Sequence, residues 1–128
     1  MLLLDTHVWV FYYTKQFQHL SKPALDAINN EKSLAISPIS GWELAQLVKK
    51  KRVKLEIDII RWISLTRKDQ RLLLLDLSLD ILVQSVQFDD LHKDPADRII
   101  AATSIVNSIP LITADKKLLQ YSKLDTIW

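Results

Sequence analysis

The chain has 128 residues, a formal net charge of +2, 48% hydrophobic and 25% charged residues, one glycine and no cysteine. Such a composition indicates a folded, globular chain, and the length indicates one domain that spans residues 1–128. The absence of cysteine excludes disulfide frameworks, zinc–thiolate sites and cysteine nucleophiles, whereas the small net charge neither requires nor forbids a nucleic-acid partner.

The N-terminal sequence MLLLDTH has no basic region before its apolar run, and Asp5 interrupts that run at once. It therefore lacks the pattern of a secretory signal peptide. The apolar run VWVFYY is far too short to cross a bilayer. We expect a cytoplasmic protein that does not associate with membranes.

Short apolar segments alternate with helical patterns along the whole chain. The predicted strands are residues 2–4, 34–37, 71–77, 110–113 and 125–128. The predicted helices are residues 6–17, a segment that starts at Ser21 or Lys22 before Pro23, and residues 38–51, 58–69, 79–88, 95–107 and 116–121. This alternation predicts an α/β fold, a three-layer sandwich with a central, mostly parallel sheet covered by helices on both faces.

Four acidic residues stand at or near predicted helix starts, and they are Asp5, Glu43, Asp97 and Asp115. In a parallel α/β fold the helices begin at the edge of the sheet where the strands end, and ligands bind at that edge. The four acids are therefore predicted to lie on one edge of the sheet. Two carboxylates about 4 Å apart repel by roughly 4 kcal/mol at an effective dielectric constant of 20, so a converging set requires a cation.

Each of these acids also has a purely local explanation. Asp5 and Asp115 can cap the helices that follow them. Asp94 fits the N-cap of the helix that Pro95 opens, which places Asp97 in its first turn, where a carboxylate suits the helix dipole. These explanations do not compete with a shared site, because a capping acid still lies on the same edge of the sheet.

Glu43 has two local alternatives. The segment SGWE, residues 40–43, matches a capping box, in which Ser40 is the N-cap and Glu43 the third helical residue. Ser37 can equally be the N-cap, with Pro38 as the first helical residue. Under either alternative a solvated glutamate is the default expectation.

The helix of residues 95–107 is apolar around most of its girth, so we expect it to be largely buried and Asp97 to need a partner, for which Arg98 is a candidate. His7, His19 and His92 are isolated in the sequence and lack zinc spacing, and His92 beside the acidic loop is expected at the surface or next to the ligands. An all-oxygen ligand set favours a hard ion, Mg²⁺ or Mn²⁺.

Four segments in this order resemble those of PIN-domain ribonucleases of the VapC toxin type: LLLDTHVWV, SPISGWELAQLVKKKRVKL, HKDPADRIIAATS and PLITADKKL. The resemblance implies a Mg²⁺- or Mn²⁺-dependent endoribonuclease, the toxin of a toxin–antitoxin pair. The metal ligands and catalytic acids that it implies are Asp5, Glu43, Asp97 and Asp115, with Thr6, Asp94 and Thr113 beside them. Lys51 departs from the pattern, because many relatives have glycine there, and this bears on how the helix with Glu43 ends.

The same resemblance implies three partners: an RNA substrate, a cognate antitoxin and a second copy of the chain. Some of the aromatic side chains could form the face of a homodimer, although most are expected in the core; the candidates are Trp9, Phe11, Tyr12, Tyr13, Trp42 and Trp62. Contacts to RNA phosphates are assigned to the basic residues nearest the acids in sequence, which are Lys93, Arg98, Lys116 and Lys117. The run KKKRVK, residues 49–54, is denser, but it equally fits a solvated helix end.

Two other functions remain open at this stage. A phosphotransferase could use Asp5 as the nucleophile that carries an aspartyl phosphate, but enzymes of the haloacid-dehalogenase type need a second aspartate two residues on, where this chain has His7. A PIN-like module could instead bind RNA or protein without cutting it. Such a module would be expected to have lost some of its acids, and all four are present.

Overall fold

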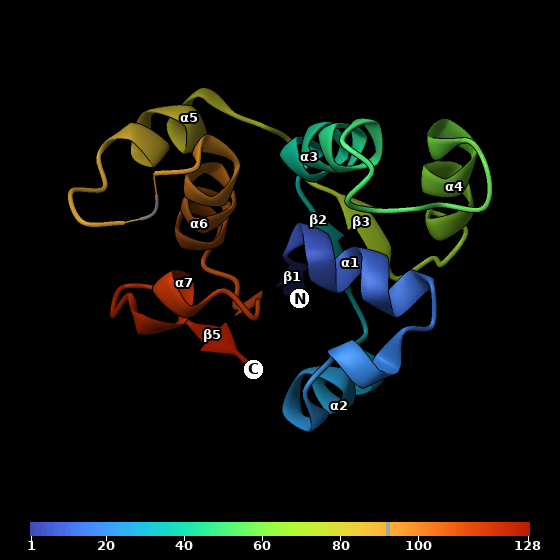
Figure 1. The fold of residues 1–128 in the computed structure, drawn as a ribbon. Coiled ribbons are helices and arrows are strands. Elements are labelled where there is room, and N and C mark those ends of the chain that lie inside the picture. Colours follow the sequence, from blue (N-terminus) through green and yellow to red (C-terminus); the bar gives the residue numbers. More distant parts are fainter. Residues whose placement is uncertain (92) are drawn as a thin grey trace.

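The computed structural model describes residues 1–91 and 93–128, so the expectation for His92 lies outside the described residues. Five strands form one sheet in the order β3-β2-β1-β4-β5, and all four strand pairings are parallel (Figure 1). The strands are β1 (Leu2–Leu4), β2 (Leu34–Ile36), β3 (Leu72–Leu74), β4 (Leu111–Ile112) and β5 (Thr126–Ile127). The predicted α/β fold with a central parallel sheet is thus confirmed.

Helices cover both faces of this sheet. Figure 1 shows α5, α6 and α7 on one side of the strands and α1, α2 and α4 on the other. The helices are α1 (Thr6–Tyr13), α2 (Lys22–Asn30), α3 (Pro38–Lys49), α4 (Ile59–Thr66), α5 (Leu79–Val86), α6 (Pro95–Asn107) and α7 (Lys116–Gln120), with a short 3₁₀ turn, η1 (Phe17–His19). α3 follows β2 and contacts both α1 and α6, so it links the two helical layers.

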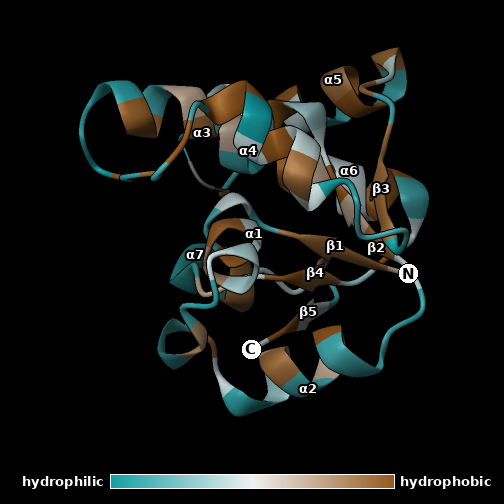
Figure 2. Cartoon of the chain, turned by 90° about the vertical axis from the view of Figure 1, so that its right-hand side faces the viewer, coloured by the Kyte–Doolittle hydropathy of each residue, from teal (hydrophilic) through white to brown (hydrophobic). Residues whose placement is uncertain are grey.

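Alternate residues of the strands divide the core into two clusters. Leu2 and Leu4 belong to a cluster with α1, α2 and α4, whereas Leu3 between them belongs to a cluster with α5, α6 and α7. The same alternation holds in β2, where Leu34 and Ile36 face one way and Ala35 the other. Figure 2 shows the resulting pattern, with hydrophobic strands in the middle and hydrophilic residues on the outer surfaces. These two apolar layers fix the strands, and thereby the positions of the residues that follow each strand.

The predicted helix of residues 6–17 is wrong at its C-terminal end, because α1 stops at Tyr13. Lys15 adopts a left-handed backbone conformation with φ of 59°. The amides of Lys15 and Gln16 then donate to the carbonyls of Tyr12 and Phe11, the hydrogen-bond pattern that closes a helix end. The predicted strand of residues 71–77 is likewise too long, since β3 covers only Leu72–Leu74.

α3 ends at Lys49, two residues before its predicted end, by the same mechanism. Lys51 has φ of 58°, the left-handed conformation for which glycine is favoured. The departure noted at Lys51 therefore does bear on how this helix ends. Among the described residues, no helix is both long enough and apolar enough to span a membrane.

Candidate metal centre

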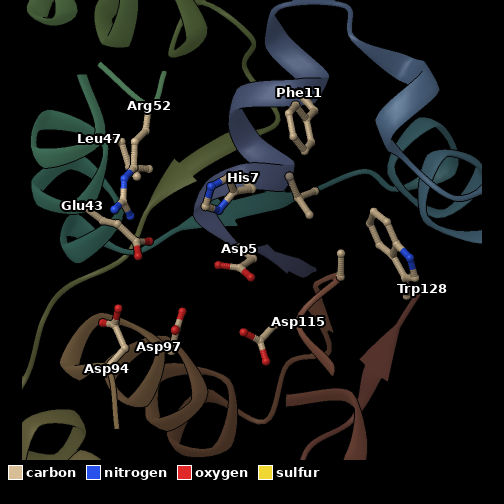
Figure 3. A pocket seen from close by; sticks show the side chains of 12 residues that line it. Asp5, His7, Phe11, Glu43, Leu47, Arg52, Asp94, Asp97, Asp115 and Trp128 are labelled. Atoms are coloured by element: carbon tan, nitrogen blue, oxygen red, sulfur yellow. The ribbon is translucent and has the colours of Figure 1, made fainter. Parts of the chain in front are cut away.

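Three carboxylates from separate elements converge at the edge of the sheet where the strands end. Asp5 directly follows β1, Glu43 lies on α3 and Asp97 lies in the first turn of α6. One oxygen from each of them lies within 4.8 Å of the others. Figure 3 shows the three side chains pointing toward one another from two sides of a cavity. The sequence separation of these residues is large, so their convergence is a product of the parallel topology.

Asp5 is held rigidly at the end of β1. Its Oδ1 accepts a hydrogen bond of 2.7 Å from the Thr6 amide, so the predicted helix cap is confirmed. Its Oδ2 accepts a hydrogen bond of 2.6 Å from the Thr113 hydroxyl at the end of β4. Burial raises the pKa of Asp5, and these two hydrogen bonds oppose that rise. The carboxylate is therefore fixed in orientation and still has lone pairs that face the cavity.

Glu43 does not belong to a capping box. Ser37 is the N-cap of α3 and accepts a hydrogen bond from the Ile39 amide, so the alternative with Pro38 as the first helical residue is confirmed and the capping box is wrong. Ser40 is instead buried and accepts a hydrogen bond of 3.0 Å from the Thr6 hydroxyl. This leaves Glu43 one turn further along the helix, on the face that lines the cavity.

The Glu43 carboxylate is poorly compensated. Its Oε1 is buried without a hydrogen-bond partner among the described residues. Burial raises the pKa of Glu43, the nearby Thr6 side chain opposes this rise, and the charge of Asp5 adds to it. A buried oxygen without a partner costs free energy that a bound cation would recover.

Asp97, in the first turn of α6, also has a strongly raised pKa. Asp94 caps α6 by accepting a hydrogen bond of 2.8 Å from the Ala96 amide, and this places Asp97 in the first turn as predicted. Burial, followed by the charges of Asp5 and Glu43, raises the pKa of Asp97 to about 8. Such a shift marks a group for which the surroundings have too little positive charge.

Asp115 and Asp94 line the same cavity but lie outside the tight group of three. Asp115 caps α7 by accepting hydrogen bonds of 2.9 and 3.1 Å from the amides of Lys117 and Leu118, which confirms the predicted cap. Its own amide donates to the Thr113 hydroxyl at 3.1 Å. Thr113 thus joins Asp115 to Asp5, and the charge of Asp115 helps to raise the pKa of both Asp5 and Asp97.

The cavity has a volume of about 410 Å³ and an acidic lining. Five carboxylates line it, whereas the basic residues of its wall are His7 and Arg52. Sequence reasoning missed both in this role. His7 follows the Asp5–Thr6 pair in the first turn of α1, and Arg52 follows the left-handed residue that ends α3. The glycine-like position at Lys51 was the signal from which the placement of Arg52 could have been found.

The four basic residues assigned to RNA contacts are placed differently from one another. Lys93, Lys116 and Lys117 are exposed and are not among the residues that line the cavity. The Arg98 side chain instead donates hydrogen bonds of 2.8, 3.2 and 2.7 Å to the carbonyls of Ser85, Val86 and Phe88. Arg98 therefore binds the C-terminal end of α5, and these contacts fix how α5 sits against α6.

A hard divalent cation fits the residues that converge here. The donor atoms are carboxylate oxygens, which suit such an ion, and Glu43 also has a buried oxygen without a hydrogen-bond partner among the described residues. The raised pKa values of Asp5, Glu43 and Asp97 also reflect too little positive charge around the three carboxylates. A cation would reverse it by favouring the ionised form of each carboxylate.

Comparison with known proteins agrees with this geometry. The PIN domain family model matches residues 2–124 of the chain. The chain is 31% identical over 129 aligned residues to Ribonuclease VapC22 of Mycobacterium tuberculosis, with 99% of this chain and 98% of that protein covered.

Solved structures with the same fold include members of toxin–antitoxin complexes. A chain of a toxin–antitoxin complex from Klebsiella pneumoniae has a TM-score of 0.66 at 21% identity, with 96% of this chain and 94% of that chain covered. A chain of DNA-bound VapBC from Salmonella typhimurium has a TM-score of 0.67 at 17% identity, with 98% and 95% covered. At these identities the likeness concerns the fold.

Proposed function

Because the chain belongs to the PIN-domain family, we propose that it is a metal-dependent endoribonuclease and the toxin of a toxin–antitoxin pair. The observation that carries this proposal is the convergence of Asp5, Glu43 and Asp97 in one acidic cavity, with ligand oxygens within 4.8 Å of one another. The 31% identical relative is named as a ribonuclease, which supports RNA as the substrate.

Asp5, Glu43 and Asp97 are proposed to hold Mg²⁺ or Mn²⁺, with Asp115 as a further ligand, directly or through water. When bound, such an ion activates water and stabilises charge on a phosphate group. Thr113 and the Thr6 amide orient the Asp5 carboxylate, so that residue needs no rearrangement to act as a ligand. Asp94 holds the first turn of α6, and thereby Asp97, in place.

The chain's own residues also set the conditions for hydrolysis of a phosphodiester. Burial of Asp5, and the half-buried positions of Glu43 and Asp97, keep the carboxylates in a medium of low dielectric constant, where their charges act strongly on a bound ion. The cavity opens at the sheet edge, and its volume of about 410 Å³ accommodates a nucleotide-sized group.

The test is cleavage of RNA by the purified protein, with the cut ends mapped by sequencing. Cleavage should require Mg²⁺ or Mn²⁺, stop with a chelator and fall by about 10³-fold or more in Asp5→Asn, in line with the loss of a group that acts only through the ion. Asp58→Asn is the matched control. Asp58 also caps a helix and is exposed outside the cavity, so its variant should cut normally.

Two outcomes would redirect the assignment. RNA that stays intact at high protein and Mn²⁺ concentrations, yet is bound, would favour a PIN-like binding module. A phosphorylated Asp5 trapped from a phosphate donor would favour the phosphotransferase alternative. The same cleavage in Asp5→Asn and the wild type would contradict a shared metal centre at this site.

The cognate partner of the toxin is proposed to be an antitoxin protein. The neighbours with the same fold that come from toxin–antitoxin complexes support this proposal. Co-expression of the chain with the product of an adjacent small reading frame should relieve growth inhibition, and the two proteins should co-purify. Relief without co-purification would contradict a direct protein antitoxin.

A second copy of the chain is proposed as a further partner. Edge strand β3 exposes Leu73 and Leu74, and α5, the next element, exposes Leu79, Val83 and Val86. Of the aromatic residues that the sequence offered for such a face, Trp9 and Trp62 are buried, whereas Trp42 is 50% exposed. Exposed apolar side chains on an edge strand and on a helix favour association. Light scattering should give the mass of a dimer, and Val86→Lys should lower it.

A further inference from the structure

Arg52 stands out among the residues of the acidic cavity, because its charge is permanent and opposite to that of the carboxylates. Five carboxylates line the cavity, and Arg52 shares its wall with them. Figure 3 shows the guanidinium turned toward the cavity on the side of Glu43. In residues 1–91 and 93–128, no hydrogen bond or ion pair engages this guanidinium. Its donors thus remain available to a ligand.

The backbone places Arg52 there by a defined turn. At the end of α3 the Lys51 amide donates to the Val48 carbonyl at 3.1 Å, and the Arg52 amide donates to the Leu47 carbonyl at 2.9 Å. Lys51 supplies the left-handed conformation, with φ of 58°, that this reversal needs. The next residue, Val53, packs against the core. The turn therefore brings Arg52 back beside the helix face that carries Glu43 and Leu47, both of which line the cavity.

The charge of the cavity explains why a cation is needed in addition to a metal. One divalent ion offsets two of the five lining carboxylates, so an RNA phosphate that approaches the site still meets negative charge. A positive side chain at the wall lowers this repulsion. An arginine does more than a lysine, because its planar guanidinium donates two parallel hydrogen bonds to one phosphate group.

The other arginines and lysines near the acids do not meet this need as directly. Arg98 is engaged by the carbonyls at the end of α5. Lys93, Lys116 and Lys117 are exposed and outside the residues that line the cavity. Lys49 and Lys50, which precede Arg52, are exposed and also absent from that lining. The run of basic residues after α3 thus contributes one member to the site and leaves the rest to solvent.

We propose that Arg52 binds the RNA phosphate that enters the acidic cavity, so that it is a substrate-positioning residue of this site. The inference rests on the proposed ribonuclease function, and it gives a role to a residue that is neither one of the acids of the site nor one of the four basic residues assigned to RNA contacts from the sequence. Arg52 anchors the phosphate from the wall formed by α3, opposite the wall that carries Asp94 and Asp97 (Figure 3).

The test compares Arg52→Gln, Arg52→Lys and Lys50→Gln. Loss of a bidentate, charge-assisted contact should lower kcat/KM for RNA by about 10- to 100-fold in Arg52→Gln. Arg52→Lys keeps the charge but loses the paired geometry, so it should recover part of the loss. Lys50→Gln removes the same charge two residues away and should change kcat/KM by less than about threefold. Guanidinium ion added to Arg52→Ala should restore part of the activity.

Two further measurements separate a contact with RNA from other roles. Binding of Mn²⁺ alone should stay as tight in Arg52→Gln as in the wild type or become tighter, because a positive charge is removed from beside the ion. Weaker Mn²⁺ binding would assign Arg52 to the metal centre and overturn the proposal. Equal kcat/KM values in Arg52→Gln and Lys50→Gln would overturn it as well.

RNA binding, measured without cleavage, tests the role of Arg52 independently of the proposed ribonuclease function. Binding of a fluorescent single-stranded RNA is measured in the Asp97→Asn protein, with and without Arg52→Gln. If the wild-type chain cuts no RNA, the ribonuclease function fails, and this binding measurement still decides on Arg52. A loss of affinity of about 10-fold or more on removing Arg52 supports the proposal, and an unchanged affinity overturns it.

Discussion

Charged side chains gather at both ends of the strands, and the two groups differ in how their charges are compensated. At the edge where the strands end, Asp5, Glu43 and Asp97 face one another and each has a raised pKa. At the edge where the strands begin, Arg71 precedes β3 and forms an ion pair of 3.0 Å with Asp69. The first group is an acid cluster in need of a cation, and the second is a completed network.

The network around Arg71 gives all five guanidinium N–H groups an acceptor. Arg71 donates to the carbonyls of Ile28 and Glu31 at 2.9 and 3.2 Å and to the Tyr12 hydroxyl at 3.2 Å, and it is bound twice by Asp69. Burial acts to raise the pKa of Asp69, but hydrogen bonds from Arg71 and Tyr13 outweigh it and the pKa is lowered. These contacts tie α1, α2 and the start of β3 together.

The Arg71–Asp69 network stabilises the folded state, whereas the crowded carboxylates of the acid cluster destabilise it. Compensated charges lower the free energy of the folded state, whereas crowded carboxylates raise it unless a ligand is present. Removing a charge should therefore have opposite effects on stability at the two edges. Relief of the repulsion in the acid cluster would contribute to the binding free energy of a cation.

Arg71→Ala should give the largest effect on stability, a loss of about 2–4 kcal/mol in the free energy of unfolding. The substitution removes the cation that pairs with Asp69 and the side-chain donor to two backbone carbonyls, and partly buried groups that lose such partners are costly. Urea unfolding followed by circular dichroism measures the change. Arg61→Ala, at an exposed position of α4, is the control and should lie within about 0.5 kcal/mol of the wild type. Equal losses in the two variants would contradict the role assigned to the network.

Asp97→Asn should change the free energy of unfolding in the opposite direction and stabilise the metal-free protein by about 1–3 kcal/mol near neutral pH. Near neutral pH the folded protein must either take up a proton at Asp97 or bury its charge beside Asp5 and Glu43, and asparagine removes that cost. Asp80→Asn is the matched control, because Asp80 is an exposed acid in the first turn of α5, and it should destabilise slightly.

Addition of Mg²⁺ sharpens the same comparison. The melting temperature of the wild type should rise with Mg²⁺ concentration, as expected for a ligand that binds only the folded state. In Asp97→Asn this rise should be small or absent, whereas in Asp80→Asn it should match the wild type. A Mg²⁺ response of Asp97→Asn as large as that of the wild type would remove Asp97 from the metal centre.

The pH dependence of stability should carry the signature of the acid cluster. The pKa of Asp97 is raised from 3.8 to about 8 in the folded protein. Between these values the folded state holds a proton that the unfolded state has lost, so the contribution of Asp97 to stability falls as the pH rises. For this one group, the slope of the free energy of unfolding against pH has an upper limit of about 1.4 kcal/mol per pH unit. The lowered pKa of Asp69 acts in the opposite direction, since its contribution is lost as the pH falls.

Urea unfolding in the presence of chelator, at several pH values between about 5 and 8, measures this slope. Asp97→Asn should flatten the curve, and saturating Mg²⁺ should do the same in the wild type by keeping the carboxylates ionised in the folded state. A metal-free wild type whose stability does not fall over this range would contradict the raised pKa of Asp97.

The starts of the helices could be predicted from the sequence more closely than their ends. Ser37 with Pro38 and Asp94 with Pro95 fix two starts by local chemistry that is visible in the sequence. The ends of α1 and α3 depend on lysines in a left-handed conformation, a role that sequence patterns assign to glycine. The predicted strand of residues 2–4 matches β1, but the other four predicted strands are longer than the observed ones, because a run of apolar residues does not show where pairing stops.

The acids of the site could be predicted because topology places every strand end on one edge. The basic side chains that lie beside these acids could not be predicted in the same way. Arg98 is adjacent to Asp97 in sequence, but its side chain leaves the site to bind the end of α5. Arg52 lies in a run of basic residues that fits a solvated helix end, and only the reversal at Lys51 brings it to the cavity. Side-chain direction after a turn is a tertiary property, which residue spacing alone does not determine.

The two strained lysines allow the smallest but most closely matched test. Lys15 and Lys51 end α1 and α3 with φ values of 59° and 58° and the same pair of closing hydrogen bonds. Glycine relieves the left-handed strain in each, so Lys15→Gly and Lys51→Gly should both stabilise the chain by about 0.5–1 kcal/mol.

The effects of the two variants on function should differ, because the turn at Lys51 holds Arg52 beside the acid cluster. The turn at Lys15 leads into η1, no residue of which lines that cavity. A more flexible glycine at position 51 should lower kcat/KM for RNA by a few-fold, and glycine at position 15 should leave it unchanged. If both variants cut RNA as the wild type does while gaining stability, then the turn places Arg52 without help from the side chain at position 51. If Lys51→Gly loses stability instead, the Lys51 side chain contributes contacts that outweigh its backbone strain.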